Sequence, residues 1–236
     1  MKDNDFLVMD SCTIISLSMN CLASVLKKFA QQGRNFCVPP SVYNEIYSQP
    51  LKSKQFLWPA LKVKKYFNEG FLTILKSPTL EKDTQEILFW SNKIYSTSKG
   101  SIHLIHRGEA EVMALAKYYN QSTIATDEYI TRLLIEEPFT LKKHFERKLH
   151  MPVEVNEKSL AEFQKLVNGI NIVRSAEIIA LAFEQGFFDE DIRVISKSIN
   201  NAKAELIRGM LWALKFSGCS MFVSEIEDYV TLLTKV

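Results

Sequence analysis

Short apolar runs alternate with longer, helically spaced segments over the first two-thirds of the chain. The runs are brief, rich in Val, Ile, Leu and Phe, and bounded by polar or Pro residues, as in strands. They cover residues 6–10, 36–38, 71–75 and 122–126. Apolar residues at helical spacing occupy residues 22–32, 40–48, 80–97 and 109–119. This alternation predicts an α/β fold with a mostly parallel sheet flanked by helices on both sides.

After about residue 156 the pattern predicts helices alone. The helical segments cover residues 159–167, 175–186, 189–199 and 202–218, and Gly186 and Gly218 are placed as C-terminal stops. We therefore expect an α/β domain over residues 1–155 and an all-α C-terminal domain over residues 156–236. Residues 206–216 are apolar on nearly every side, which fits a helix buried in its own domain or in a subunit interface.

Charge is distributed unevenly along the 236 residues, although the net charge is only +2. Residues 1–151 carry 20 Lys and Arg against 15 Asp and Glu, whereas the remainder carries 9 against 12. Positive charge clusters at residues 52–54, 62–65 and 141–150. These clusters are either phosphate-contacting surfaces or solvated helix faces.

The cysteines and the hydropathy of the chain indicate the cellular compartment of the protein. The four cysteines, at positions 12, 21, 37 and 219, form no C-x-x-C pair, so neither a zinc site nor a disulfide framework is indicated. Reduced thiols predict a cytoplasmic protein. Only four apolar residues precede Asp10, and Lys215 interrupts the most apolar late stretch, so we expect neither a signal peptide nor a membrane span.

Two of the predicted strands end on an aspartate, Asp10 and Asp127. In an open parallel sheet the functional crevice lies outside the carboxyl ends of the strands. If the two strands are neighbours, their carboxylates repel each other, which raises one pKa or requires a cation. The alternative is that each aspartate only caps the helix that follows it.

Two further acids could reach the same edge. Glu45 lies in a helix that starts after a double proline, and Glu109 lies in the first turn of a helix, where the dipole favours an anion. Glu111 lies about 200° from Glu109 around that helix, so only one of them can face a site. For Glu45 the alternative is a solvated position on a helix surface.

Four segments occur in the order DSCTIISL, PPSVYNEI, GEAEVMALA and ATDEYITRLL. This order resembles the PIN-domain superfamily of metal-dependent ribonucleases, over about residues 5–155. The resemblance implies that Asp10, Glu45, Glu109 and Asp127 form the acidic quartet that binds Mg²⁺ or Mn²⁺. It also matches Thr13 to a small hydroxyl residue found after the first acid. The third acid is Glu where many relatives have Asp, and the last 80 residues have no counterpart in the compact toxin members.

The implied activity is metal-dependent endoribonuclease chemistry, because hard divalent cations prefer carboxylate oxygens and activate water for attack on phosphorus. Asp10 and Asp127 are expected to be the principal ligands and Glu109 a ligand or a water-positioning group. Glu45 is expected to support these ligands or to bind a second ion. The histidines show no H-E-x-x-H spacing and are expected at the surface or in loops.

Substrate binding is expected from Thr13, Arg107 and Arg132, although each arginine could instead pair with a neighbouring carboxylate. Tyr43, Trp58 and Tyr129 are candidates for base stacking or for ordinary packing.

Candidate partners are RNA, an inhibitor or antitoxin-like protein and a second copy of the chain. Two other functions stay open. One is an inactive PIN-fold module that binds nucleic acid or protein, and the other is a metal-dependent DNA nuclease of the flap-cutting type.

Overall fold

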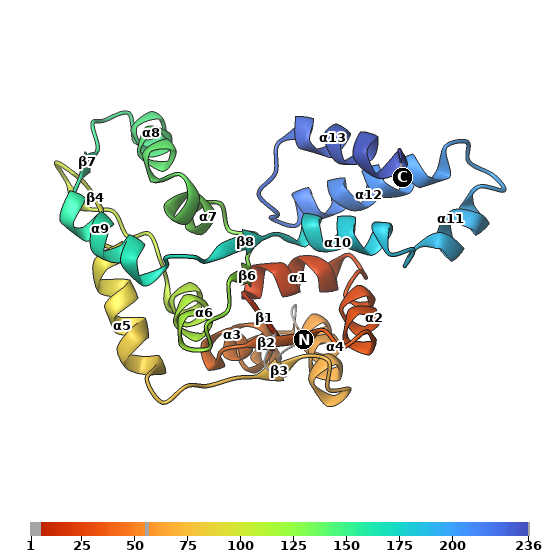
Figure 1. Ribbon diagram of the computed structural model, residues 1–236, viewed down its shortest axis with the longest axis horizontal. Coiled ribbons are helices and arrows are strands. Elements are labelled where there is room, and N and C mark those ends of the chain that lie inside the picture. The colour runs from red at the N-terminus through yellow and green to blue at the C-terminus, as the bar shows by residue number, and fades with distance from the viewer. Residues whose placement is uncertain (1–5, 55–56, 236) are drawn as a thin grey trace.

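The computed structural model describes residues 6–54 and 57–235 and has a five-stranded parallel sheet at its centre (Figure 1). The strands lie in the order β3-β2-β1-β6-β8. Their bounds are Phe6–Met9 (β1), Asn35–Val38 (β2), Thr73–Ile74 (β3), Thr123–Ala125 (β6) and Asn171–Val173 (β8). The first four confirm the strands predicted from the apolar runs. The α/β class is therefore correct.

Strand β8 corrects the expectation that only helices follow residue 156. It pairs in parallel with β6, with Ile172 opposite Ile124. The parallel sheet thus includes residues beyond the predicted boundary at 155. Asn171 interrupts the apolar residues around β8, so no continuous apolar run marks this strand in the sequence, and its pairing could be recognised only in three dimensions.

Helices connect the strands of the sheet. Their bounds are Ser11–Met19 (α1), Ser24–Gln31 (α2), Pro40–Tyr43 (α3), Leu57–Asn68 (α4), Leu80–Ser91 (α5), Arg107–Tyr118 (α6), Tyr129–Glu136 (α7), Pro138–Leu149 (α8) and Glu157–Leu166 (α9). A π-helical turn, η1 (Asn44–Ser48), and a 3₁₀ turn, η2 (Pro50–Lys52), follow α3. The helices predicted at 22–32, 40–48 and 109–119 are confirmed.

The helix predicted over residues 80–97 is wrong at its C-terminal end. Helix α5 ends at Ser91, and the residues after it enter a small antiparallel sheet with the order β5-β4-β7. Its strands are Tyr95–Thr97 (β4), Gly100–Ser101 (β5) and Glu154–Val155 (β7). Tyr95 is almost fully buried, and its hydroxyl donates to the Pro138 carbonyl at the start of α8 at 2.6 Å.

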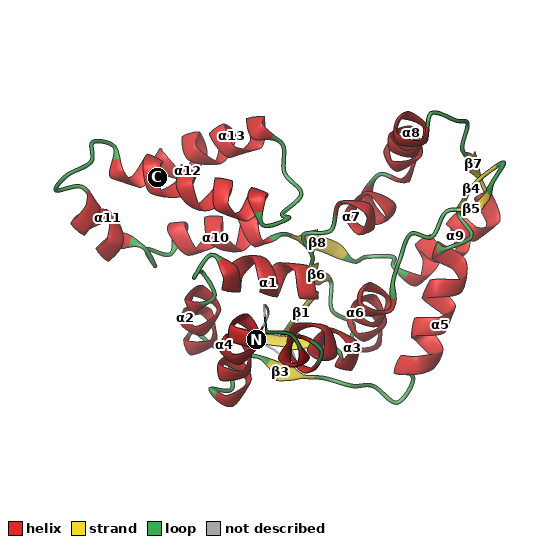
Figure 2. Ribbon diagram, turned by 180° about the vertical axis from the view of Figure 1, so that it is seen from behind, coloured by secondary structure: helices red, strands yellow, loops and turns green. Residues whose placement is uncertain are grey.

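Four helices come after β8 and lie together at one end of the molecule, opposite the end formed by α5, α8 and α9 (Figures 1 and 2). They are Ser175–Glu184 (α10), Asp189–Ile195 (α11), Ala202–Phe216 (α12) and Val223–Thr234 (α13). Gly186 and Gly218 have φ angles of 71° and 106°, which confirms them as stops after α10 and α12.

Helix α12 is buried on one side only. Ile207, Leu211 and Leu214 are buried, whereas Phe216 is 81% exposed. The expectation that this helix is buried on nearly every side is therefore wrong, because only one face of α12 is buried.

The central strands are apolar because both of their faces are covered. Val8, Met9 and Ala125 are fully buried, and α6 packs against β1 and β6. Among the described residues, no single helix has the length and apolar character needed to cross a membrane. Helices α1 and α2 meet that test only as a pair, bent by 109°.

Candidate functional site

Strands β1 and β6 are neighbours in the sheet, so their carboxyl ends lie at one edge. The register places Met9 opposite Ala125. Asp10 therefore lies opposite Thr126, and its amide donates to the Ala125 carbonyl at 2.8 Å. Asp127 lies one residue further along. Because successive residues of an extended chain point to opposite sides, this offset directs the two aspartates away from each other.

A pocket of about 260 Å³ lies beside Asp10. Its lining residues are Asp10, Ser11, Cys12, Glu45, His106, Gly108, Glu109 and Glu128. The structure thus brings together three of the four predicted acids: Asp10 directly after β1, Glu45 in η1 and Glu109 in α6. Asp127 is not among the lining residues.

Asp10 is held by neutral donors. It is only 4% exposed, and its Oδ2 accepts from Cys12 Sγ at 2.9 Å and from Thr126 Oγ1 at 3.3 Å. Cys12 Sγ in turn accepts from the amide of Asp127 at 3.1 Å. Burial raises the pKa of Asp10, although the bonds from Cys12 and Thr126 oppose the shift. The carboxylate thus depends on uncharged donors to offset its burial: a thiol, a hydroxyl and the backbone amides of Ser11 and Cys12.

Glu109 lies in the first turn of α6 and is poised to exchange a proton near neutral pH. Its pKa is raised to about 7, first by burial and then by the negative charge of Asp10 and, further, of Glu128. The His106 amide donates to it at 2.6 Å and Thr131 Oγ1 at 3.3 Å, which limits the rise in pKa.

Glu45 reaches the pocket from the π-helical turn η1. Burial raises its pKa, and the charges of Asp10 and Glu111 add to the rise. Its carboxylate lies against Gly108 on α6, where an added Cβ would come within 3.0 Å of Oε1 and 3.3 Å of Oε2. The glycine thus lets the first turn of α6 approach this carboxylate closely.

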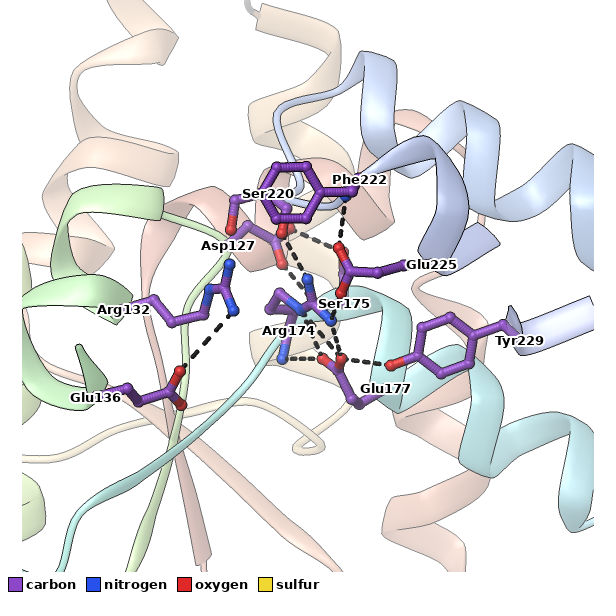
Figure 3. A network of polar contacts seen from close by, with 10 residues as sticks. All are labelled: Asp127, Arg132, Glu136, Arg174, Ser175, Glu177, Ser220, Phe222, Glu225 and Tyr229. Carbon is purple, nitrogen blue, oxygen red and sulfur yellow. Dashed lines mark hydrogen bonds and ion pairs between the residues drawn. The ribbon is translucent and has the colours of Figure 1, made fainter. Parts of the chain in front are cut away.

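Asp127 is 1% exposed and has a different set of partners. Its Oδ1 accepts from the Ser175 amide at 2.7 Å and its Oδ2 from the Ser175 hydroxyl at 2.8 Å, at the start of α10 (Figure 3). Asp127 therefore anchors the C-terminal helices. The next residue, Glu128, lines the pocket instead and caps α7 by accepting from the Ile130 amide at 3.4 Å.

The residues predicted to bind substrate do not line the pocket. Thr13 is fully buried in α1, and its hydroxyl has no hydrogen-bond partner in the described part of the chain. Arg107 pairs with Glu81 and, at 2.8 Å, with Glu111. Arg132 pairs with Glu136 at 3.8 Å. Both arginines therefore pair with carboxylates, which was the alternative to substrate binding.

Glu111 is buried on the other side of α6 from the pocket. It accepts from the Ser41 amide at 3.0 Å and the Ser41 hydroxyl at 2.7 Å. The expectation that only one of Glu109 and Glu111 faces the site is confirmed.

The described residues contain no group of three or more His, Cys, Asp or Glu side chains placed to hold a metal ion. The expected quartet is therefore not assembled as one cluster. The strand register explains why, because it turns Asp127 out of the pocket. Glu109 is hydrogen-bonded to the His106 amide and to Thr131, and Glu45 to Ser11.

Sequence reasoning missed Cys12, His106 and Glu128 as pocket residues. Cys12 and Glu128 adjoin or nearly adjoin the predicted acids, and His106 immediately precedes the first turn that carries Glu109. The signal that could have identified these three residues is their proximity in sequence to the predicted acids. It could not tell which of Asp127 and Glu128 faces the pocket, because that depends on the pairing of β6.

Comparison with known proteins assigns neither a family nor an activity to the chain. No protein-family model, no curated protein and no solved structure matches the chain. The likeness to the PIN-domain superfamily thus rests on the four sequence segments, and the case for an activity rests on the geometry of the pocket.

Proposed function

We propose that this protein is a metal-dependent endoribonuclease with a PIN-like sheet, and that its active site is the pocket of Asp10, Glu45 and Glu109. One observation carries the proposal: three carboxylates from separate elements line one pocket at the carboxyl edge of the sheet, and burial and neighbouring negative charge raise the pKa of Glu45 and Glu109. Such a gathering of acids is costly unless a cation or a bound proton neutralises it.

The chemistry of the donors fits Mg²⁺ or Mn²⁺, since both ions prefer carboxylate oxygens and Mg²⁺ keeps several waters. Asp10, Glu45 and Glu109 would hold the ion. Glu45 and Glu109 would have to rotate toward Asp10, because the described side chains do not form a three-ligand group. A bound divalent ion would supply positive charge to the phosphoryl oxygens and lower the pKa of water.

The residues of the pocket would have distinct roles. Asp10 is fixed by Cys12 and Thr126 and would be the principal ligand. Glu109, with a pKa of about 7, would orient the attacking water or take its proton. Glu128 adds a fourth carboxyl group to the pocket lining in place of Asp127.

A second candidate function is a module that binds RNA or protein without cleaving. The bonding of Asp10 to a thiol and a hydroxyl favours it, because those donors satisfy the carboxylate without a metal ion. Under this alternative, neutralising the pocket acids would leave binding unchanged.

The test is cleavage of a panel of structured and unstructured RNAs with Mn²⁺, with Mg²⁺ and with EDTA. Asp10→Asn and Glu109→Gln are expected to abolish cleavage or reduce it at least about a hundredfold, in the range of lost catalytic groups. Glu136→Gln, which changes an acid outside the pocket, serves as the matched control and is expected to cleave like the parent.

Circular dichroism of each variant checks that the fold is kept. If Asp10→Asn cleaves as well as the parent, the proposal is wrong. RNA binding with no cleavage in any metal would support the second candidate.

A further inference from the structure

Two exposed histidines lie on the segment that leads from the small sheet into α6. Leu104 and Ile105 are buried between them, whereas His103 and His106 are exposed. Asn92 fixes this segment: its Oδ1 accepts from the amides of Leu104 and Ile105 at 2.6 and 3.0 Å, and its Nδ2 donates to the Ile105 carbonyl at 3.0 Å. The segment therefore presents both imidazole rings on the outside of a fixed backbone.

His106 is the histidine that reaches the acidic pocket, where it is one of the lining residues. Burial raises the pKa of Glu45, and the charge of His106 opposes that rise. The backbone amide of His106 donates to Glu109 at 2.6 Å. The centre of the His103 ring lies 4.9 Å from the centre of the His106 ring. His106 is thus held beside two of the carboxyl groups proposed to bind the ion, with a second ring packed against its own.

The other donor side chains of the pocket lining are already engaged. Four of the eight lining residues carry carboxyl groups, so side-chain donors are few. Ser11 is hydrogen-bonded to Glu45, and Cys12 Sγ donates to Asp10 at 2.9 Å. Within the described part of the chain, no carboxylate accepts a hydrogen bond from the ring of His106. This ring is therefore the donor of the pocket lining that is not committed to an acid.

A phosphodiester needs such a donor, because the carboxylates repel its negative charge. The metal ion of the proposed function would offset part of this repulsion. Arg107, the residue after His106, pairs with Glu81 and, at 2.8 Å, with Glu111, on the side of α6 away from the pocket. An imidazole carries at least one N–H in either protonation state, so it can donate to a phosphate oxygen whether or not it is charged.

We propose that His106 binds a phosphate group of the RNA at the mouth of the acidic pocket, where a ring N–H donates to a phosphate oxygen. The inference rests on the proposed nuclease function and adds a substrate-binding residue to it. The contact with His103 limits the rotation of the ring. Because every nucleotide carries a phosphate, the contact positions the strand over the carboxylates without selecting a base.

His106 could instead be a ligand of the metal ion, since imidazole binds several transition metals. Two observations favour the phosphate. The ring is exposed, whereas Asp10, the proposed principal ligand, is only 4% exposed. The pocket also offers enough carboxylate oxygens for an ion that keeps several waters, but it offers a phosphate no other uncommitted donor side chain.

The test compares two replacements of similar length. His106→Gln keeps an N–H donor, whereas His106→Met has none. Affinity for a short fluorescein-labelled RNA is read from fluorescence anisotropy, with Ca²⁺ in place of Mn²⁺, and gel electrophoresis checks that the RNA stays intact. His106→Met is expected to weaken binding about tenfold, the effect of losing one hydrogen bond to a charged group, whereas His106→Gln stays within about threefold of the parent.

A second measurement separates a phosphate contact from a metal ligand. Mn²⁺ affinity without RNA, measured by electron paramagnetic resonance, is expected to be the same in the parent, His106→Met and His106→Gln. The matched control for RNA binding is His150→Met, at an exposed histidine that ends α8 and does not line the pocket. It is expected to bind RNA like the parent. Circular dichroism checks that all variants are folded.

Equal RNA affinity of the parent and His106→Met would overturn the inference. So would equal losses in His106→Met and His106→Gln, which would indicate a structural role for the residue before α6. A fall in Mn²⁺ affinity in His106→Met would make the residue a metal ligand. If the parent binds RNA through His106 but cleaves it with neither Mn²⁺ nor Mg²⁺, the nuclease proposal fails alone. If the parent cleaves RNA and His106→Met binds it equally well, only this inference fails.

Discussion

Asp127 binds the backbone and the hydroxyl of Ser175 inside the protein, at 2.7 and 2.8 Å. Asp127→Ala is expected to lower the free energy of unfolding by about 3 kcal/mol, because it removes charged hydrogen bonds and leaves buried donors unpaired. Urea denaturation measures the change. Asp127→Asn keeps an acceptor for the Ser175 amide and should lose less. A loss of RNA cleavage with no loss of stability would instead place Asp127 in the active site.

Glu109 makes the stability of the metal-free protein depend on pH. Its pKa is about 7 in the folded protein against an ordinary 4.5, so between these values the folded chain holds a proton that the unfolded chain has released. The free energy of unfolding therefore falls as the pH rises through this window. Glu109→Gln removes the titration and should flatten the decline between about pH 5 and about pH 8.

Denaturation at several pH values in EDTA measures this effect. Parallel curves for Glu109→Gln and the parent would contradict it. Added Mn²⁺ is expected to stabilise the parent more than the variant at about pH 8, because the ion and the proton compete for the same carboxylate.

Substitution of Gly108 distinguishes an effect on the packing of the pocket from an effect on the stability of the helix. In Gly108→Ala the new Cβ would lie 3.0 Å from Oε1 of Glu45 and displace that carboxylate. Alanine favours the helix by about 1 kcal/mol, so unfolding should be no easier while RNA cleavage falls. Gly209→Ala on α12, where nothing lies within 4 Å of the added Cβ, is the control and should leave cleavage unchanged. Equal cleavage by both variants would argue against a role for Glu45.

At the scale of elements, Arg174 joins α10 to α13 (Figure 3). It is 6% exposed and donates to Glu177 at 3.0 Å, to Glu225 at 2.9 Å and to the Ser220 carbonyl at 2.6 Å. Burial alone would raise the pKa of Glu177, but the bonds from Arg174 and its charge hold that pKa below its usual range. The sequence contained no sign of this network, because its members come from distant segments.

Arg174→Met is expected to cost about 3 to 5 kcal/mol of stability, since it leaves partly buried carboxylates without their cation. Arg208→Met is the matched control: Arg208 pairs with Glu227 at 2.9 Å at the surface, where water screens the pair, so the loss should be much smaller. Thermal and urea unfolding of both variants measure the difference. Similar losses would show that Arg174 does not hold α10 to α13.

Element by element, segments with regular helical spacing or a continuous apolar run were predictable, and these included short strands such as β3 and β6. The helix expected at 109–119 forms as α6, because its apolar spacing and its acidic first turn are local signals. Strand β8 and the end of α5 at Ser91 escaped prediction because the first depends on pairing with β6 and the second on the small sheet around Tyr95. Glu45 and Glu109 could be nominated from helix starts, but their meeting with Asp10 could not.

For the whole molecule, polar contacts tie the C-terminal helices to the end of α1 and to the segment after β6. Asn20 Nδ2 donates to Ser217 Oγ at 2.8 Å, and the Ser220 amide donates to the Asp127 carbonyl at 3.2 Å. We therefore expect one cooperative unfolding transition. A variant with Trp58→Phe and Trp90→Phe keeps Trp212 on α12 as its reporter. Its fluorescence midpoint should coincide with the midpoint of far-ultraviolet circular dichroism, and two separate midpoints would contradict the expectation.

The sequence by itself determined the α/β class, four of the five strands of the central sheet and the nomination of Asp10, Glu45 and Glu109, because periodicity, turn residues and helix starts act over a few neighbouring residues. Tertiary structure alone decided the direction of Asp127. Pairing of β1 with β6 sets Asp10 opposite Thr126, and a shift of one residue along a strand reverses the side to which a side chain points. Strand register depends on contacts between distant segments, which no local pattern records.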